Sequence, residues 1–196
     1  MKCDILIAGV GGQGTVLASR LLAASAIGTG FFARTAETIG MAQRGGCVVS
    51  HVRIGSEEAG PVIPYGAADL LIGFEPAEAA RNICRLSPAG RCIVNTRELR
   101  PVTASLETIP YDSAPVYDFI KANSSKAVMV DGYALAEGAG SVRALNIVLL
   151  GVAAASGFLP LERDEIMEAI DKNVSPKYLE LNKKAFDIGF CYLKNI

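Results

Sequence analysis

The stretch ILIAGVGGQG, residues 5–14, decides how the rest of this sequence is interpreted. The run from Cys3 to Ala8 is rich in apolar and β-branched residues, as in a central parallel strand that is buried on both faces. TVLASRLLAASAI, residues 15–27, predicts a helix that ends at the glycines that follow it. FFARTAE, residues 31–37, predicts a second strand. Strand, glycine turn, helix and strand together indicate a βαβ unit.

Gly9, Gly11 and Gly14 form a G-x-G-x-x-G pattern between the predicted strand and helix. In the dinucleotide-binding fingerprint these glycines permit a tight turn, close approach of a pyrophosphate and close helix packing. Glu37 lies at roughly the spacing of the acid that binds the ribose. However, Gly12 makes the turn crowded, and no G-K-[ST] follows, which excludes a Walker A loop. A close strand–helix turn without any ligand explains the pattern equally well.

A second glycine motif, ETIGMAQRGG at residues 37–46, has no role in a dinucleotide site. Gly45 and Gly46 permit positive φ angles and hence a backbone nest for an anion, beside the cation of Arg44. Gln43 adds a donor and an acceptor. The alternative is a glycine turn that leads into the next strand, with Arg44 in solvent.

The remaining pattern predicts a single three-layer α/β/α domain over residues 1–196, Rossmann-like, with a mainly parallel central sheet. The 47–54 segment alternates, with His51 and Arg53 on a polar face, so a mixed sheet is the alternative to an all-parallel one at this strand. Residues 56–68 are expected to form an exposed loop. Further strands are expected at 68–74, 90–96 and 126–132, with a short one near 107–109, and helices at 76–86, 115–123, 142–155, 161–173 and 176–193.

Composition excludes several classes of protein. The 196 residues carry a formal net charge of −1 without a basic patch, so no nucleic-acid partner is expected. The N-terminus is interpreted as a strand rather than a signal peptide. The longest apolar run, residues 144–158, is too short to cross a bilayer, so no membrane partner is expected. A cytoplasmic location is predicted.

The titratable side chains suggest no independent catalytic centre. Five dispersed cysteines and one histidine give neither zinc spacing nor a cluster motif, so no metal site is predicted and the thiols are interpreted as small buried side chains. His51 is interpreted as structural or interfacial, and Glu75 as a helix cap. Asn95, Thr96 and Asp131 also follow strands. Without a nucleophile beside a base, no catalytic residue is predicted.

The motifs in their order resemble a known family. GVGGQG (9–14), GMAQRGG (40–46), SHVRIG (50–55) and ADLLIGFEPAEAAR (68–81) are similar to the gamma-type domain of 2-oxoacid:ferredoxin oxidoreductases, most closely its indolepyruvate-oxidising branch. The resemblance extends over nearly the whole chain, including LNIVLLG (145–151) and LELNKKAFDIG (179–189).

This resemblance implies the small subunit of an oxidoreductase that decarboxylates a 2-oxoacid, here an aryl pyruvate such as indolepyruvate. Coenzyme A takes the acyl group as cosubstrate and ferredoxin takes the electrons. The large alpha subunit is the implied partner and holds thiamine diphosphate, magnesium and 4Fe–4S clusters. No tightly bound cofactor is expected in this chain, and the isolated chain is expected to be inactive.

On the same resemblance, the two glycine loops shape the rim of a shared active site or a phosphate-binding pocket. Two other functions stay open. One is the gamma subunit of a 2-oxoglutarate, pyruvate or branched-chain oxidoreductase. The other is a free-standing protein that binds NAD(P) or FAD, or a nucleotide for regulation. The candidate cofactor-binding residues are Gly9, Gly11, Gly12, Gln13, Gly14, Gln43, Arg44, Gly45 and Gly46.

Overall fold

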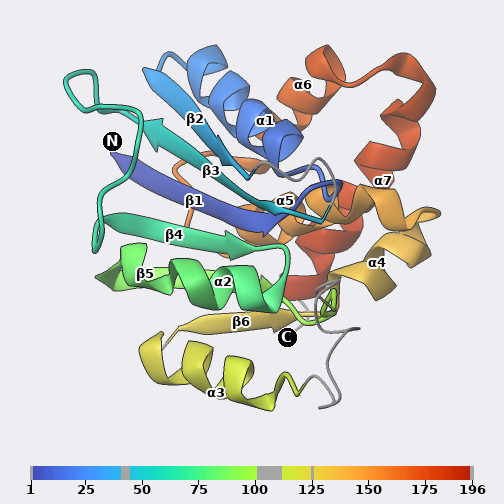
Figure 1. Cartoon of the computed structure of the whole chain (residues 1–196). Helices are drawn as coiled ribbons and strands as arrows, with labels where there is room; N and C mark the ends of the chain where they lie inside the picture. Colours follow the sequence, from blue (N-terminus) through green and yellow to red (C-terminus); the bar gives the residue numbers. More distant parts are fainter. Residues whose placement is uncertain (1, 41–44, 101–111, 125, 195–196) are drawn as a thin grey trace.

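A computed structural model describes residues 2–40, 45–100, 112–124 and 126–194 of the chain, which build an α/β fold around one mixed sheet (Figure 1). The described strands run across the sheet in the order β2 (Ala33–Ile39), β3 (Cys47–Ile54), β1 (Cys3–Val10), β4 (Ala68–Gly73), β5 (Leu86–Asn95) and β6 (Ala127–Val130).

The sheet is mainly parallel, as the sequence predicts, with one antiparallel strand. β1, β4, β5 and β6 pair in parallel, whereas β3 is antiparallel to both β1 and β2. The short link between β2 and β3 leaves no room for a crossover helix, so the two strands pair in opposite directions. The alternating sequence of β3 therefore marks the point where the parallel pattern is interrupted.

Helices cover both faces of the sheet and make three layers. One face carries most of them, as Figure 1 shows with α5 and α7 behind the strands. Their buried side chains share one apolar core, to which α1 (Thr15–Gly28), α4 (Gly132–Ala139), α5 (Leu145–Ala155), α6 (Arg163–Asn173) and α7 (Pro176–Lys194) contribute. The opposite face is covered by α2 (Pro76–Asn82) and α3 (Ala114–Asn123).

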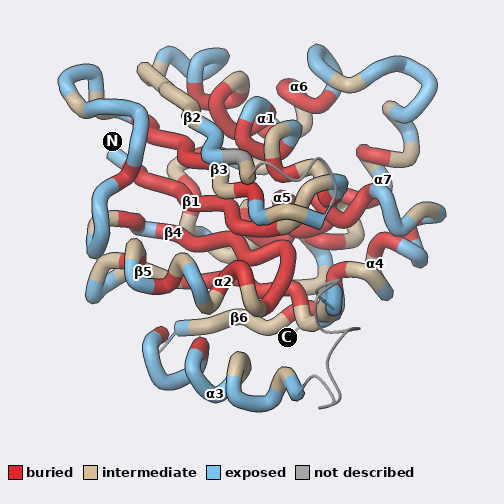
Figure 2. The backbone as a smooth tube through the Cα atoms, in the orientation of Figure 1, coloured by how far each residue is buried: buried red, intermediate tan, exposed pale blue. Residues whose placement is uncertain are grey.

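The two central strands β1 and β4 are buried on both faces, as predicted, and Figure 2 shows them in the buried middle of the sheet. Alternate residues of β1 face the two cores: Ile5 and Ile7 belong to the larger one, Leu6 and Ala8 to the smaller. Leu70 to Phe74 are likewise buried. Burial on both sides explains why these strands are apolar without alternation.

Several boundaries differ from the sequence-based prediction, among them that of β2, which was expected over 31–37 and lies at Ala33–Ile39. The helix expected over 76–86 ends at Asn82, followed by a short 3₁₀ helix, η1 (Ile83–Arg85), and β5 starts four residues early. Helix α4 was not predicted, because its sequence GYALAEGA is only eight residues long and contains two glycines, which disfavour a helix. A 3₁₀ turn, η3 (Val142–Ala144), precedes α5. The strand expected near 107–109 lies outside the described residues.

The polar face of β3 is buried rather than solvated. Arg53 is 6% exposed and donates from Nε and Nη2 to the Asp4 carboxylate, both at 2.8 Å, across the β1–β3 pair. The segment between β3 and β4 covers this face: Arg53 donates to the Gly60 carbonyl, and the Ile63 N–H donates to His51 Nδ1 at 3.2 Å. The loop expected at 56–68 is largely exposed, but the Ile63 side chain is buried and packs in the smaller core.

Helices α5 and α7 approach each other closely through two glycines. A Cβ atom added to Gly151 would overlap the Phe186 carbonyl oxygen, and one added to Gly189 would overlap the Val148 carbonyl oxygen. Each helix thus presents a glycine to the backbone of the other. Among the described residues, no helix is both long and apolar enough to cross a membrane.

Candidate functional site

The carboxyl ends of the parallel strands meet at one edge of the sheet, where those candidate residues that the structure describes lie. The glycine loop follows β1, and Phe74 and Glu75 follow β4. Asn95 ends β5 and donates from Nδ2 to the Phe74 carbonyl at 3.0 Å, while its Oδ1 accepts the Gly132 N–H, also at 3.0 Å. Ligands of open α/β sheets bind at this edge, which makes it the place to look for a site.

The Gln13 side chain stabilises the glycine loop through hydrogen bonds within the chain. Its Oε1 accepts the Val10 N–H at 2.8 Å, and its Nε2 donates to the Phe74 carbonyl at 3.0 Å and to the Tyr133 hydroxyl at 3.2 Å. The side chain is only 8% exposed. The amide group therefore joins the ends of β1 and β4 and has little left for a ligand.

Two glycines of the loop are required by its geometry. Gly14 is the N-cap of α1 with φ 82°, a left-handed conformation, and an added Cβ would lie 2.6 Å from Asn146 Nδ2. At Gly9 an added Cβ would lie 2.7 Å from Gln13 Oε1 and 2.9 Å from Phe74 Cβ. The loop is thus a close strand–helix turn whose geometry alone explains both glycines, with or without a ligand.

The two glycine loops are in contact, as the proposal of a shared pocket requires. The Gly11 N–H donates to the Gly46 carbonyl at 2.8 Å. Gln43 and Arg44 lie outside the described residues. Within the described residues, the N–H groups of Gly12, Gly14 and residues 15–17 have no acceptor, whereas the Ala18 N–H donates to the Gly14 carbonyl. A role of these loops in binding a ligand stays a prediction.

The strand order does not suit a redox dinucleotide. In the dinucleotide-binding fold the second strand pairs directly with the first, so that its acid reaches the ribose beside the glycine loop. Here β3 separates β2 from β1. Glu37, on β2, accepts a hydrogen bond from the Ser19 hydroxyl of α1 at 3.2 Å. Glu37 is therefore hydrogen-bonded within the chain, and its strand is not the one next to β1, where a ribose-binding acid would lie.

Glu75 and Asp131 are helix caps. The Glu75 carboxylate is 2% exposed and accepts the Glu78 N–H at 2.9 Å, which caps α2 as the sequence suggests. Asp131 accepts the Ala134 N–H and caps α4. Both carboxylates therefore have a structural hydrogen bond within the chain.

His51 has the structural role that the sequence favours. It is 1% exposed, and burial lowers its pKa from 6.5 to about 4, with the Arg85 and Arg53 charges acting in the same direction. The imidazole is therefore neutral at physiological pH and accepts the Ile63 N–H through Nδ1.

The cysteines correct one expectation. Cys3 and Cys92 are buried, and burial raises the pKa of both thiols, that of Cys3 to about 12. Cys47, Cys84 and Cys191 are exposed, so only two of the five are buried side chains, because the others lie at a strand start, in a 3₁₀ turn and near the end of α7. Within the described residues, no three His, Cys, Asp or Glu side chains come together as metal ligands.

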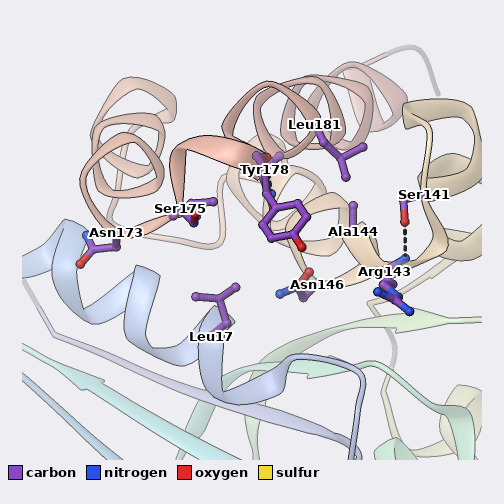
Figure 3. A pocket seen from close by; sticks show the side chains of 11 residues that line it. Leu17, Ser141, Arg143, Ala144, Asn146, Asn173, Ser175, Tyr178 and Leu181 are labelled. Atoms are coloured by element: carbon purple, nitrogen blue, oxygen red, sulfur yellow. Dashed lines mark hydrogen bonds between the residues drawn. The ribbon is translucent and has the colours of Figure 1, made fainter.

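A pocket of about 520 Å³ lies behind the first turn of α1, and no sequence pattern predicted it (Figure 3). α1, the η3–α5 junction and the α6–α7 turn surround it. Asn146 connects it to the glycine loop, since its Nδ2 donates to the Gly14 carbonyl at 3.3 Å. Its lining side chains come from segments more than a hundred residues apart, which no local pattern reveals. They are Leu17, Ser141, Arg143, Ala144, Asn146, Asn173, Val174, Ser175, Tyr178, Leu181 and Asn182.

Comparison with known proteins identifies the family. A family model described as pyruvate ferredoxin/flavodoxin oxidoreductase matches residues 4–192. The chain belongs to this family. Its relatives in the family include an indolepyruvate oxidoreductase subunit from Pyrococcus horikoshii, 37% identical over 188 residues, 95% of this chain and 93% of that protein. A pyruvate/ketoisovalerate oxidoreductases common subunit gamma from Thermococcus kodakarensis is 26% identical over 190 residues, 95% of each chain.

A solved structure of the same oxidoreductase class has the same fold. The gamma subunit of a keto/oxoacid ferredoxin oxidoreductase from Geobacter sulfurreducens PCA matches with a TM-score of 0.72, at 24% identity, over 99% of both chains. The likeness covers the chain from end to end, so the mixed sheet and its helices are the architecture of this oxidoreductase subunit as well.

Proposed function

We propose that the chain is the small subunit of an indolepyruvate, or more broadly aryl-pyruvate, ferredoxin oxidoreductase. The observation that carries the proposal is the contrast in identity, 37% to an indolepyruvate oxidoreductase subunit against 26% to a pyruvate/ketoisovalerate one. In the proposed reaction the oxoacid loses carbon dioxide, its acyl group passes to coenzyme A, and two electrons reduce ferredoxin.

In this proposal the cofactors belong to the large subunit and not to this chain. The large alpha subunit is proposed to hold thiamine diphosphate, magnesium and the 4Fe–4S clusters, which supply the decarboxylation and electron transfer. This chain is proposed to act as one domain over residues 1–196 in the cytoplasm. Its five cysteines are free thiols, which agrees with a reducing compartment.

The residues proposed to meet a ligand in the assembled enzyme are those of the two glycine loops. The hydrogen bond from Gly11 to Gly46 joins the loops. The N–H groups of Gly12 and of residues 15–17 stay available, and a helix N-terminus favours an anion. A phosphate of coenzyme A or the substrate carboxylate is the anion we propose, with Arg44 as its cation.

Reconstitution tests the proposal. The chain is co-expressed with its large subunit, and ferredoxin reduction is measured with indolepyruvate, pyruvate, 2-oxoglutarate and a branched-chain 2-oxoacid, each with coenzyme A. We expect indolepyruvate to give the highest kcat/KM, and the chain alone to be inactive even with added thiamine diphosphate. A preference for another oxoacid would refute the substrate. Failure to bind any large subunit, or activity of the chain alone, would refute the role as a subunit.

A further inference from the structure

A closed ring of hydrogen bonds joins the glycine loop to helix α4. The side-chain amides of Gln13 and Asn95 both donate to the Phe74 carbonyl, each at 3.0 Å. The Asn95 Oδ1 atom accepts the Gly132 N–H at 3.0 Å. The hydroxyl of the next residue, Tyr133, accepts the second Nε2 proton of Gln13 at 3.2 Å and closes the ring. The ends of β1, β4 and β5 are thus joined to the first turn of α4, which lies at the same edge of the sheet (Figure 1).

This ring of hydrogen bonds is buried and closely packed. Asn95 is completely buried and Gln13 is nearly so. The Gln13 amide has a partner for its oxygen, the Val10 N–H, and a partner for each of its two protons. A Cβ atom added to Gly132 would lie 2.7 Å from Leu145 Cδ1, so the start of α4 packs closely against α5. A shift of the glycine loop therefore breaks a buried hydrogen bond, which is unfavourable.

The Tyr133 ring is held in place independently of its hydroxyl. It packs against the larger core. The Arg97 guanidinium lies over the ring, 5.0 Å from its centroid, and pairs with Glu137 at 3.5 Å, one turn further along α4. Asn95 Nδ2 also donates to the Arg97 carbonyl at 3.0 Å, which fixes the backbone from which this side chain extends. The change Tyr133→Phe is therefore expected to remove the bond to Gln13 and to leave the ring where it is.

We propose that Tyr133 is a positioning residue for the Gly9–Gly14 loop. Without the hydroxyl, one buried proton of Gln13 has no acceptor, so the amide turns or shifts and the adjoining backbone moves with it. On either side of Gln13 are Gly12 and Gly14, whose N–H groups have no acceptor within the described residues. Donors to an anion bind it best when they are fixed before it arrives. The position of the loop is a property of this chain, whereas its effect on catalysis rests on the proposed function.

Hydrogen–deuterium exchange of the full chain tests the position of the loop directly. In Tyr133→Phe we expect the backbone amides of residues 10–16 to exchange about fivefold faster, since one hydrogen bond that holds the loop is lost. The amides of α5 and α7 should keep their rates. Tyr65→Phe is the matched control and should leave all rates unchanged. An arginine, Arg85, lies over the Tyr65 ring as well, at 4.4 Å, but this tyrosine precedes β4 at the opposite edge of the sheet, and its hydroxyl has no hydrogen bond among the described residues.

Kinetics of the reconstituted enzyme test the consequence for the reaction. A loop that has its binding geometry for only a fraction of the time lowers the apparent affinity by that fraction. Tyr133→Phe should therefore raise the KM of the ligand bound at the loops, indolepyruvate or coenzyme A, about fivefold and change kcat less than twofold. Because Tyr133 acts through Gln13, Tyr133→Phe should add less than a twofold effect when Gln13→Ala is already present.

The outcomes separate this inference from the proposed function. Unchanged exchange of residues 10–16, or faster exchange spread evenly over the chain, would overturn the role of Tyr133. Unchanged KM values in an active enzyme, or the full effect of Tyr133→Phe in the Gln13→Ala background, would do the same. An assembled enzyme that oxidises none of the 2-oxoacids, even with the natural chain, would instead refute the proposed function, and the exchange rates alone then decide whether Tyr133 positions the loop.

Discussion

Single residues at the sheet edge show why polar side chains in a glycine-rich sequence are hard to interpret. Gln13 and Asn95 both donate to the Phe74 carbonyl at 3.0 Å, and both are buried. Leaving such a carbonyl without a partner would be unfavourable, so the sequence needs amide side chains at these positions even without a ligand. A polar residue at the end of a strand therefore indicates a buried hydrogen bond. It does not by itself indicate a binding site.

The Asp4–Arg53 ion pair gives the first prediction at this scale. Both side chains are almost fully buried, with 2% and 8% exposure. Asp4→Asn leaves the guanidinium charge buried without its carboxylate, and we expect the free energy of unfolding to fall by about 3 kcal/mol. Urea unfolding measures the change.

Two comparisons test this explanation. Asp187→Asn removes one of the two carboxylate partners of Arg163 in a partly exposed pair and should cost less than about 1 kcal/mol. The double variant Asp4→Leu with Arg53→Met should recover most of the loss, because no uncompensated charge is left. A loss for Asp4→Asn as small as that of the exposed pair would contradict the buried-charge argument.

His51 gives a pH-dependent prediction. Its pKa of about 4 lies below the ordinary 6.5, because burial and the charges of Arg85 and Arg53 disfavour the imidazolium. The unfolded chain therefore binds this proton first as the pH falls, so the stabilisation is complete above about pH 6.5 and is lost between pH 6.5 and 4. The shift corresponds to about 3 kcal/mol.

The His51→Gln variant isolates that contribution. Its amide oxygen can still accept the Ile63 N–H, but it does not titrate. The free energy of unfolding, measured at several pH values, should fall less steeply between pH 6.5 and 4 in the variant than in the natural protein. Parallel curves for the two proteins would show that His51 titrates normally in the fold.

At the scale of elements, the sequence predicted most of the fold. The apolar runs of β1 and β4 and the alternation of β3 indicated buried and half-polar strands, and these were confirmed. The alternation could not show that the polar face of β3 would be covered. The covering segment, residues 55–67, is held by hydrogen bonds between Arg53 and Gly60 and between Ile63 and His51, and such contacts leave no periodic pattern in the sequence. The pocket behind α1 was missed for the same reason, whereas α4 was missed because it is short and contains two glycines.

The close contact between α5 and α7 leads to a prediction about stability. Gly151→Ala or Gly189→Ala places a methyl group against the facing backbone, which cannot move away as a side chain can. We expect each variant to lower the free energy of unfolding by about 2 kcal/mol or more. Gly138→Ala in α4, where an added Cβ meets no atom within 4 Å, is the control and should leave stability unchanged or slightly higher.

Thermal and urea unfolding of the three glycine variants measure the effect. Equal stability of all three would show that the two helices can separate without cost, contrary to the close approach in the fold.

For the whole molecule, the chain presents two neighbouring features on one side of α1 and its preceding loop. The glycine loops meet at Gly11 and Gly46, and the pocket touches the same turn through Gly14 and Asn146. A ligand or partner that reaches the loops thus comes next to the pocket. The sequence located the loops through their glycines, whereas the pocket depends on α7, which returns to α1 from the far end of the chain.

Arg44 carries the last prediction, which belongs to the assembled enzyme. The Gly11–Gly46 hydrogen bond joins the end of its loop to the glycine loop that leads into α1, and the free N–H groups at the N-terminus of that helix favour an anion. If Arg44 binds an oxyanion there with two parallel hydrogen bonds, Arg44→Ala should lower ferredoxin reduction by the reconstituted enzyme about tenfold or more, and Arg44→Lys less. Lys121→Ala on α3 serves as the matched loss of a surface charge, and circular dichroism of every variant checks folding. Turnover of Arg44→Ala equal to that of the Lys121→Ala control would assign the arginine to a solvated turn and remove the cation from the proposed anion site.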